Sequence, residues 1–308
     1  MRALLIINPV ATATSARGRE DLIASLGGLF ELDVAHTGHR GHAESLSRQA
    51  AANSLDLVVA VGGDGTVNEV VNGLLGDQSA PDPPAFGVVP EGNANVFARA
   101  LGISPDPGRA TGQLLDALRA GRRRWVGLGR ANDRWFTFCA GFGLDAEVVR
   151  EVERRRAAGT PASSSLFVRA AVRQFLGTRT RRAPPITLEQ PKAAPAGPFC
   201  LGIVSNSRPW TYLGNRPVVA SPAAGFATGL DLLAARRLGA LTTASTLVRM
   251  LTPHGRPAAN RFMLGLHDLR EFTLAANEPL AAQLDGEYVG NRRSLRFQAV
   301  PGALSVVH

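Results

Sequence analysis

Lysine is almost absent from this sequence of 308 residues. The single copy, Lys192, lies in the proline-rich stretch QPKAAPAGP. P-loop enzymes and protein kinases place a lysine on the phosphates of their nucleotide, and a lone lysine in a proline-rich loop is a poor candidate for that position. If this protein handles phosphate, it does so with backbone amides and arginines, which supply nearly all of the positive charge behind the net charge of +9.

Cysteines, aromatic residues and long apolar runs are also scarce. Cys139 and Cys200 each lie in an apolar stretch, which favours buried free thiols and a reducing cytosol. No run approaches the roughly 18–20 apolar residues that span a bilayer, and the N-terminus MRALLIINPV has no signal-peptide cleavage pattern. Aromatics make up 6% of the chain, and none interleaves with arginines as a stacking platform, so we expect no nucleic-acid partner. These features predict a cytoplasmic protein.

The first part of the chain alternates short apolar runs with helix-like segments. This alternation predicts a doubly wound α/β domain over 1–124, with a parallel sheet covered on both faces and ligands at the carboxyl ends of its strands. The expected strands are Ala3–Asn8, Glu31–Thr37, Asp56–Val61 and Ala85–Pro90, and the expected helices are Gly18–Leu29, His42–Asn53, Thr66–Leu75, Asn93–Leu101 and Pro107–Ala120.

Beyond Trp125 the pattern changes to strands with few helices. It predicts a second domain over 125–297, a mostly antiparallel β-sandwich, while a segment near 298–308 could return to the first domain. The proline-rich segment Ala183–Pro198 is expected to form an exposed hairpin or loop. The strand-like segments are WVGLGRA, RWFTFCAG, ITLEQ, FCLGIVSN, LDLLAARR, REFTLAA and SLRFQAV.

The stretch VVAVGGDGTVNEVV places three glycines and an aspartate between an apolar strand and a helix. A helix N-terminus offers free N–H groups and partial positive charge, and glycines let an anion approach the backbone. Thr66 can cap the helix and donate to a phosphate. Asp64 would repel a bare phosphate, so its presence favours an intervening magnesium ion or sugar hydroxyl; a tight turn capped by Asp64 or Thr66 is the structural alternative.

Five stretches together resemble the diacylglycerol kinase catalytic-domain family, which includes bacterial lipid kinases and sphingosine kinases and is distantly similar to NAD kinases. They span nearly the whole chain in the family's order. One departure is that Gly92-Asn93 stands where the family usually has Gly-Thr. The stretches are IINPVA (Ile6–Ala11), VVAVGGDGTVNEVVNGLL (Val58–Leu75), FGVVPEGNANVFARALGI (Phe86–Ile103), CAGFGLDAEVV (Cys139–Val149) and QLDGEYVG (Gln283–Gly290).

The resemblance implies an ATP- and Mg²⁺-dependent lipid kinase acting on diacylglycerol or a related lipid. Glu287 would be the general base, Asp64 would act through Mg²⁺, and Asp285 would support the base or contact metal. Asp145 would either bind the polar head of the acceptor or N-cap the helix that follows it. The implied nucleotide-binding residues are Asn8, Thr37, Gly62, Gly63, Gly65, Thr66, Gly92 and Asn95, with the match at Thr37 a loose one.

Two alternatives share the GGDGT stretch: an NAD kinase, and a non-catalytic nucleotide or lipid sensor, for which the altered Gly92-Asn93 motif leaves room. The DGE stretch favours a lipid acceptor, and Asp64 together with Glu287 favours catalysis.

The chain also has a belt of basic residues. With a lipid substrate, we expect this belt to make a peripheral contact with an anionic membrane, although a solvated helix is the simpler interpretation. The sequence does not indicate the oligomeric state, and a homodimer is one alternative. The belt consists of Arg154, Arg155, Arg156, Arg169, Arg173, Arg179, Arg181 and Arg182.

Overall fold

The computed structural model shows two compact units. Unit 1 comprises Met1–Gly127 and Gly302–His308, and unit 2 comprises Leu128–Pro301. The chain passes between them within β5 (Arg123–Ala131) and β16 (Glu287–Val307). The structure describes residues 1–11, 15–76, 83–158, 169–171, 173–174, 185–252 and 262–308.

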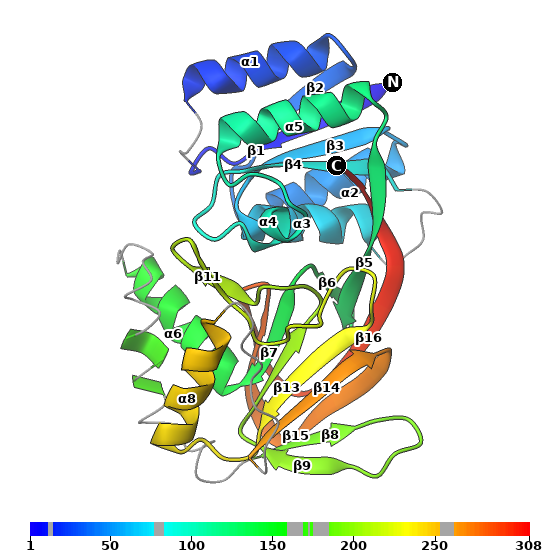
Figure 1. The fold of residues 1–308 in the computed structure, drawn as a ribbon. Coiled ribbons are helices and arrows are strands. Elements are labelled where there is room, and N and C mark those ends of the chain that lie inside the picture. The colour runs from blue at the N-terminus through cyan, green and yellow to red at the C-terminus, as the bar shows by residue number, and fades with distance from the viewer. Residues whose placement is uncertain (12–14, 77–82, 159–168, 172, 175–184, 253–261) are drawn as a thin grey trace. The chain divides into compact units, whose positions relative to one another are not determined.

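Unit 1 is a parallel sheet with helices on both faces (Figure 1). Its elements are β1 (Arg2–Ile7), α1 (Ala16–Gly27), β2 (Glu31–His36), α2 (His42–Ala52), β3 (Leu57–Gly62), α3 (Asp64–Leu75), β4 (Ala85–Pro90), α4 (Val96–Ala100) and α5 (Pro107–Arg119). The strand order is β4-β3-β1-β2, and Val306 of β16 pairs in parallel with Phe86 of β4. Every residue of β3, LVVAVG, is buried, as expected for a parallel strand covered on both sides.

Helix starts in unit 1 follow local sequence signals. The Ser15 side chain accepts a hydrogen bond from the Gly18 N–H at the start of α1. Asp106 does the same for the Arg109 N–H at the start of α5, where proline occupies the first helical position. Both are N-caps of the preferred residue types, and the fixed φ of proline suits the first turn of a helix.

Unit 2 is built mainly from antiparallel strands. Its remaining elements are β6 (Arg134–Phe136), β7 (Cys139–Gly143), α6 (Leu144–Ala157), β8 (Ile186–Glu189), β9 (Ala196–Phe199), β10 (Leu201–Ser205), β11 (Thr211–Leu213), β12 (Arg216–Val218), β13 (Leu230–Ala235), α8 (Ala240–Met250), β14 (Met263–Leu269) and β15 (Glu271–Leu284). The strands run in the order β14-β13-β10-β7-β15-β16, and β8 joins β15 to β9. The predicted fold class, α/β followed by a β-rich domain, is confirmed.

The core of unit 2 is aromatic and aliphatic. The rings of Phe272 and Phe297 stack with their centroids 5.1 Å apart, and the ring of Phe136 meets Phe297 edge-on at 6.1 Å. Such pairs add stabilisation beyond their buried area. Both cysteines are free and buried, as predicted.

Some predicted elements have different limits in the structure. The expected helix Asn93–Leu101 is only α4, because Asn95 adopts a left-handed conformation with φ 47°. The expected strand RWFTFCAG is split into β6 and β7, because the backbone of its middle residues bonds a distant carboxylate instead of a strand. EFTLAA (Glu271–Ala276) and the residues Gln283 and Leu284 belong to one long strand, β15. None of the helices in the described ranges combines the length and apolar character that crossing a membrane requires.

Candidate functional site

Four loops of unit 1 follow the carboxyl ends of parallel strands. Asn8 follows β1, Thr37 follows β2, the GGDGT stretch spans the end of β3 and the start of α3, and Gly92 and Asn95 follow β4. Because these strands are parallel and adjacent in the sheet, their carboxyl ends lie at one edge. The structure therefore brings the sequence-predicted nucleotide residues to a common edge of unit 1.

The two glycine-containing loops touch each other through their backbones. A β-carbon on Gly92 would lie 2.7 Å from the Cα of Gly63, and one on Gly63 would lie 3.1 Å from the Cα of Gly92. A β-carbon on Gly62 would lie 2.7 Å from the Oγ1 of Thr66. Side chains at these glycines would push the loops apart, so their absence is what permits the close approach.

Thr66 and Asp64 do not cap α3 as the sequence alternative expected. The helix begins at Asp64, and its N-cap is Gly63, without a side-chain bond. Thr66 lies in the first turn with Gly65, and its Oγ1 accepts a hydrogen bond of 3.1 Å from the Nδ2 of Asn8. This bond joins the Asn-Pro turn after β1 to the GGDGT stretch.

The Asp64 carboxylate caps a different helix, α4. It accepts hydrogen bonds from the N–H groups of Val96 at 3.0 Å and Phe97 at 3.3 Å. Carboxylates are favoured at a helix N-terminus by its free N–H groups and partial positive charge. Asp64 thus has a structural function in joining the two loops, which sequence reasoning did not assign to it.

Asn95 holds the second loop in a tight turn. Its Oδ1 accepts from the N–H of Gly92 at 2.8 Å, and its Nδ2 donates to the carbonyl of Gly92 at 2.7 Å. The left-handed backbone of Asn95 closes this turn and is a conformation that asparagine tolerates better than most residues. The amide expected to meet the nucleotide is therefore engaged in shaping the loop.

The ion pair Arg19–Glu91 was missed by sequence reasoning. Glu91 lies between Pro90 and Gly92, its side chain has no exposed surface, and its Oε2 is 3.0 Å from the Nη2 of Arg19. The Oε1 of Glu91 and the Nε of Arg19 are buried without a hydrogen-bond partner among the described residues. Each such atom costs roughly 1–3 kcal/mol or more. The available signal was a glutamate inside a glycine-rich loop at a strand end.

In unit 2, the Asp285-Gly286 pair forms the two-residue turn between β15 and β16. Both residues have positive φ, 49° and 79°, and Leu284 pairs with Glu287 across the turn. These are the features of a type I′ hairpin, for which Asp-Gly is a preferred sequence. The positive φ of Gly286 is a conformation that glycine adopts readily because it has no β-carbon.

The Asp285 carboxylate is buried and accepts four hydrogen bonds. The donors are the N–H and hydroxyl of Thr137, at 2.7 and 2.9 Å, and the N–H groups of Phe138 and Cys139, at 2.9 and 3.1 Å. A carboxylate has about four lone-pair sites. These bonds occupy them with protein donors, which favours the supporting role considered for Asp285 over metal contact.

Asp145 bonds Gln283 rather than capping α6, whose N-cap is Gly143. Its Oδ2 accepts from the Nε2 of Gln283 at 2.8 Å, and the Oε1 of Gln283 accepts from the N–H of Gly286 at 2.9 Å. Gln283 thus connects Asp145 to the DGE turn. A β-carbon on Gly141 would lie 1.8 Å from the same Asp145 oxygen, so only glycine leaves room for it.

Burial of the Asp145 carboxyl raises its pKa to about 6, against the smaller lowering effect of the Gln283 hydrogen bond. A carboxyl that changes charge near neutral pH can act either as a donor or as an acceptor toward a polar ligand.

Glu287 lies directly after the turn, at the start of β16, and is half-buried. The N–H of the next residue, Tyr288, donates to the carboxylate of Glu153 in α6 at 3.0 Å. Helix α6 and the DGE hairpin are thereby linked.

The fit of a magnesium ion differs between the two carboxylates proposed for it. Within the described ranges there is no group of three or more His, Cys, Asp or Glu side chains that could hold a metal. Magnesium commonly needs only one or two carboxylates, with nucleotide phosphates and water completing its shell. Asp64 fits that pattern as the single carboxylate placed between the glycines at the carboxyl end of β3, whereas the lone pairs of Asp285 are taken by four protein donors.

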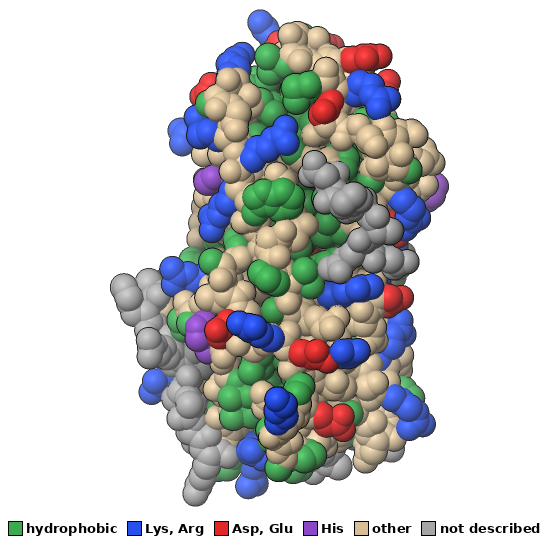
Figure 2. Space-filling view, turned by 90° about the vertical axis from the view of Figure 1, so that its right-hand side faces the viewer, with side chains coloured by type: hydrophobic (Ala, Val, Ile, Leu, Met, Phe, Trp, Pro, Cys, Tyr) green, Lys and Arg blue, Asp and Glu red, His purple; other side chains and the backbone are tan. Residues whose placement is uncertain are grey.

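The basic belt is only partly within the described residues; Arg179, Arg181 and Arg182 lie outside them. Arg154 and Arg155 both bond the Glu151 carboxylate, which lowers the pKa of Glu151 to about 2. Arg156, Arg169 and Arg173 are exposed. Figure 2 shows Lys and Arg side chains scattered among other types on one face, not gathered in a continuous patch.

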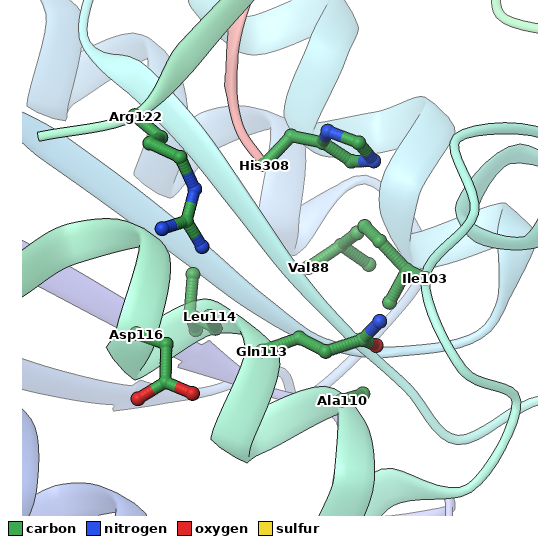
Figure 3. A pocket seen from close by; sticks show the side chains of 8 residues that line it. All are labelled: Val88, Ile103, Ala110, Gln113, Leu114, Asp116, Arg122 and His308. Carbon is green, nitrogen blue, oxygen red and sulfur yellow. The ribbon is translucent and has the colours of Figure 1, made fainter. Parts of the chain in front are cut away.

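A pocket of about 350 Å³ lies in unit 1, and none of the predicted site residues lines it. Its lining comes from β4, α5 and the ends of neighbouring segments, with the Arg122, Gln113 and His308 side chains at its border (Figure 3). It shares no lining residue with the glycine loops. The lining residues are Val88, Ile103, Ala110, Gln113, Leu114, Asp116, Arg122 and His308.

Comparison with known proteins agrees with the sequence resemblance. Residues 2–130 match the family model described as the diacylglycerol kinase catalytic domain. A diacylglycerol kinase of Bacillus subtilis (strain 168) is 37% identical over 123 residues, which are 40% of this chain and 39% of that protein. One from Staphylococcus aureus (strain bovine RF122 / ET3-1) is 34% identical over 154 residues, 49% of this chain and 46% of that protein. The matched segments thus span less than half of these relatives.

Solved structures extend the likeness in fold to the whole chain. A crystal structure of a diacylglycerol kinase from Bacillus anthracis str. Sterne superposes with a TM-score of 0.70 and 18% sequence identity, covering 100% of this chain and 96% of that one. At this level of identity the likeness concerns the fold alone.

Proposed function

We propose, from the match of residues 2–130 to the diacylglycerol kinase catalytic domain, that the chain is an ATP- and Mg²⁺-dependent lipid kinase. It transfers the γ-phosphate to the hydroxyl of diacylglycerol or a related lipid. The observation that carries this proposal is the backbone contact between the two glycine loops, Gly63 against Gly92, at the carboxyl ends of parallel strands. Such an edge presents backbone amides to an anion without needing a lysine.

The nucleotide residues have distinct roles in this proposal. The backbone of Gly62, Gly63 and Gly65 contacts the phosphates, and the Thr66 hydroxyl, oriented by Asn8, donates to them. We call the phosphate-binding site formed by the two glycine loops the nucleotide cradle. Gly92 and Asn95 shape its second side, and Thr37 contacts the adenosine. Asp64 would be the carboxylate that holds a magnesium ion, which when bound would neutralise phosphate charge. Phosphoryl transfer depends mainly on such positioning and charge neutralisation.

Glu287 is the proposed general base, which takes the proton of the lipid hydroxyl. A positioned base of this kind contributes typically about 10²–10⁴-fold to the rate. Asp285 acts as its support, because its four hydrogen bonds fix the turn that precedes Glu287. Asp145, held by Gln283, contacts the polar head of the acceptor. The exposed arginines Arg156, Arg169 and Arg173 meet anionic lipid headgroups.

The experiment is transfer of labelled γ-phosphate from Mg-ATP to a panel of lipids in mixed micelles, with NAD as an additional acceptor. Wild type is compared with Glu287→Gln and Asp64→Asn. We expect one lipid class to be labelled, Glu287→Gln to lose at least about 10²-fold in kcat, and Asp64→Asn to weaken Mg-ATP binding and turnover. Labelling of NAD alone would replace this proposal with an NAD kinase.

A non-catalytic sensor is the second candidate, and one observation favours it. Asp64 accepts two hydrogen bonds that cap α4, and this is a structural role that does not involve catalysis. Binding of Mg-ATP without phosphorylation of any lipid or NAD would support the sensor. Loss of turnover in Glu287→Gln, with Mg-ATP binding intact, would exclude it.

A further inference from the structure

The buried ion pair Arg19–Glu91 is not used by the mechanism above, yet it adjoins the proposed cradle. The Glu91 N–H donates to the carbonyl of Gly62 at 2.9 Å, so the residue is attached to the first glycine loop as well as preceding the second. Its side chain has no exposed surface, and Arg19 is 23% exposed. Buried charged groups in proteins are paired, and Arg19 is the ion-pair partner of Glu91.

Arg19 connects three segments of unit 1. Its Nη2 donates both to the Oε2 of Glu91 and to the carbonyl of Ala11 in the Asn-Pro turn, while its own backbone lies in the first turn of α1. A cation in the first turn of a helix is disfavoured by the helix dipole. Arg19 therefore does not stabilise α1 at this position, and its side-chain contacts stabilise the loops instead.

The pair is also incomplete on its own. The Oε1 of Glu91 is short of a donor and the Nε of Arg19 is short of an acceptor within the described part of the chain. Buried polar atoms are nearly always satisfied, by protein, ordered water or ligand. The Glu91–Arg19 pair therefore has hydrogen-bonding capacity beyond the bonds formed within the described residues.

We propose that Glu91 is a positioning residue of the nucleotide cradle. It acts through Arg19, by holding the guanidinium across the Asn-Pro turn and the second glycine loop. The inference rests on the proposed nucleotide site but not on the identity of the phosphate acceptor. It assigns a function to the glutamate of PEGNAN, the stretch in which this chain also departs from the Gly-Thr of its family.

The test is calorimetric titration of the full chain with Mg-ATP, without lipid. Variants are Glu91→Ala, Glu91→Gln, Arg19→Ala and the double variant Arg19→Ala/Glu91→Ala. We expect Glu91→Ala to weaken Mg-ATP binding about tenfold, the equivalent of one charge-assisted hydrogen bond. The double variant should bind no more weakly than Arg19→Ala alone, because Glu91 acts through Arg19. Glu91→Gln should recover part of the affinity, since its amide oxygen can still accept from Arg19.

Matched controls separate positioning from general destabilisation. Arg48→Ala removes an exposed ion pair with Glu44 in the same unit and should leave Mg-ATP affinity unchanged. Where turnover is measurable, Glu91→Gln should raise the KM for ATP and leave the KM for the lipid unchanged. If Glu91→Ala fails to fold, as judged by its thermal unfolding transition, Glu91→Gln and the KM comparison decide.

The outcomes distinguish this inference from the proposed function. Wild-type affinity in a folded Glu91→Ala, or additive losses in the double variant, would overturn the inference alone. Mg-ATP binding by wild type without lipid phosphorylation would overturn the lipid-kinase proposal and leave the titration series decisive. No binding of Mg-ATP by wild type would overturn both.

Discussion

Replacing Gly92 with alanine tests whether the close contact of the two glycine loops is needed for nucleotide binding. The added β-carbon would lie 2.7 Å from the Cα of Gly63 and 2.8 Å from the Oδ1 of Asn95. Real β-carbons do not approach other heavy atoms so closely, and one of these neighbours is backbone, so a loop has to move. The Asn95 amide that closes the turn through Gly92 would be displaced with it.

The magnitude follows from this geometry. Overpacking a tight contact costs typically about 1–3 kcal/mol, and losing the Asn95 bonds adds about 0.5–1.5 kcal/mol for each. We expect the free energy of unfolding to fall by about 1–3 kcal/mol, because the loop can partly relax toward solvent. Mg-ATP binding, which depends on the positions of both loops, should weaken by at least about tenfold.

The assay is calorimetric titration with Mg-ATP beside thermal unfolding. Gly63→Ala is the graded variant, because its closest contact is 3.1 Å, and it should be milder. Gly112→Ala is the matched control: it is exposed in α5 with no atom within 4 Å of the added carbon, so it should raise stability by roughly 0.5–1 kcal/mol. Wild-type affinity in Gly92→Ala would refute the argument that contact of the loops forms the cradle.

Two further predictions concern unit 2. Asp285→Asn should lower the free energy of unfolding by roughly 3–5 kcal/mol, because the side-chain amide cannot accept all four hydrogen bonds. Denaturation followed through the fluorescence of the buried Trp135 measures this change. An unchanged denaturation midpoint would contradict the prediction. The pKa of Asp145 is raised to about 6 in the folded chain. Between about pH 4 and 6 the folded chain therefore keeps a proton that the unfolded chain has lost. The contribution of Asp145 to the free energy of unfolding falls as pH rises through that window. Asp145→Asn should therefore stabilise by about 1–3 kcal/mol at pH 7.5 and have no effect at pH 4, in paired denaturant titrations; an equal effect at both values would show that the titration is not the cause.

Much of the fold could be predicted because its signals are local. Apolar runs such as VVAV and the helix-like segments between them repeat at the spacing of a doubly wound sheet. Strand Ala85–Pro90 was predicted with its observed limits, and β1, β2, α2 and α5 to within a residue or two. The failures have local causes too: the helix expected from Asn93 starts only at Val96, because the side chain of Asn95 bonds Gly92 and holds a turn.

The residues of the candidate site were also largely recognisable, but what most of them contact was not. Glycines at strand ends and the Asp-Gly turn can be read as short stretches, since backbone freedom and turn geometry depend on adjacent residues. The partners of their polar neighbours depend on which distant segments the fold brings near. No periodicity in the sequence encodes that choice.

The sequence by itself thus determined the fold class, the positions of the glycine loops and the DGE turn, because each depends on residues close together in the chain. Tertiary structure alone decided that Asp64 caps a helix 32 residues later, that Glu91 pairs with Arg19 across 72 residues, and that Asp285 binds Thr137 across 148 residues. A carboxylate accepts from any donor placed within about 3 Å, and only the folded chain selects the donor.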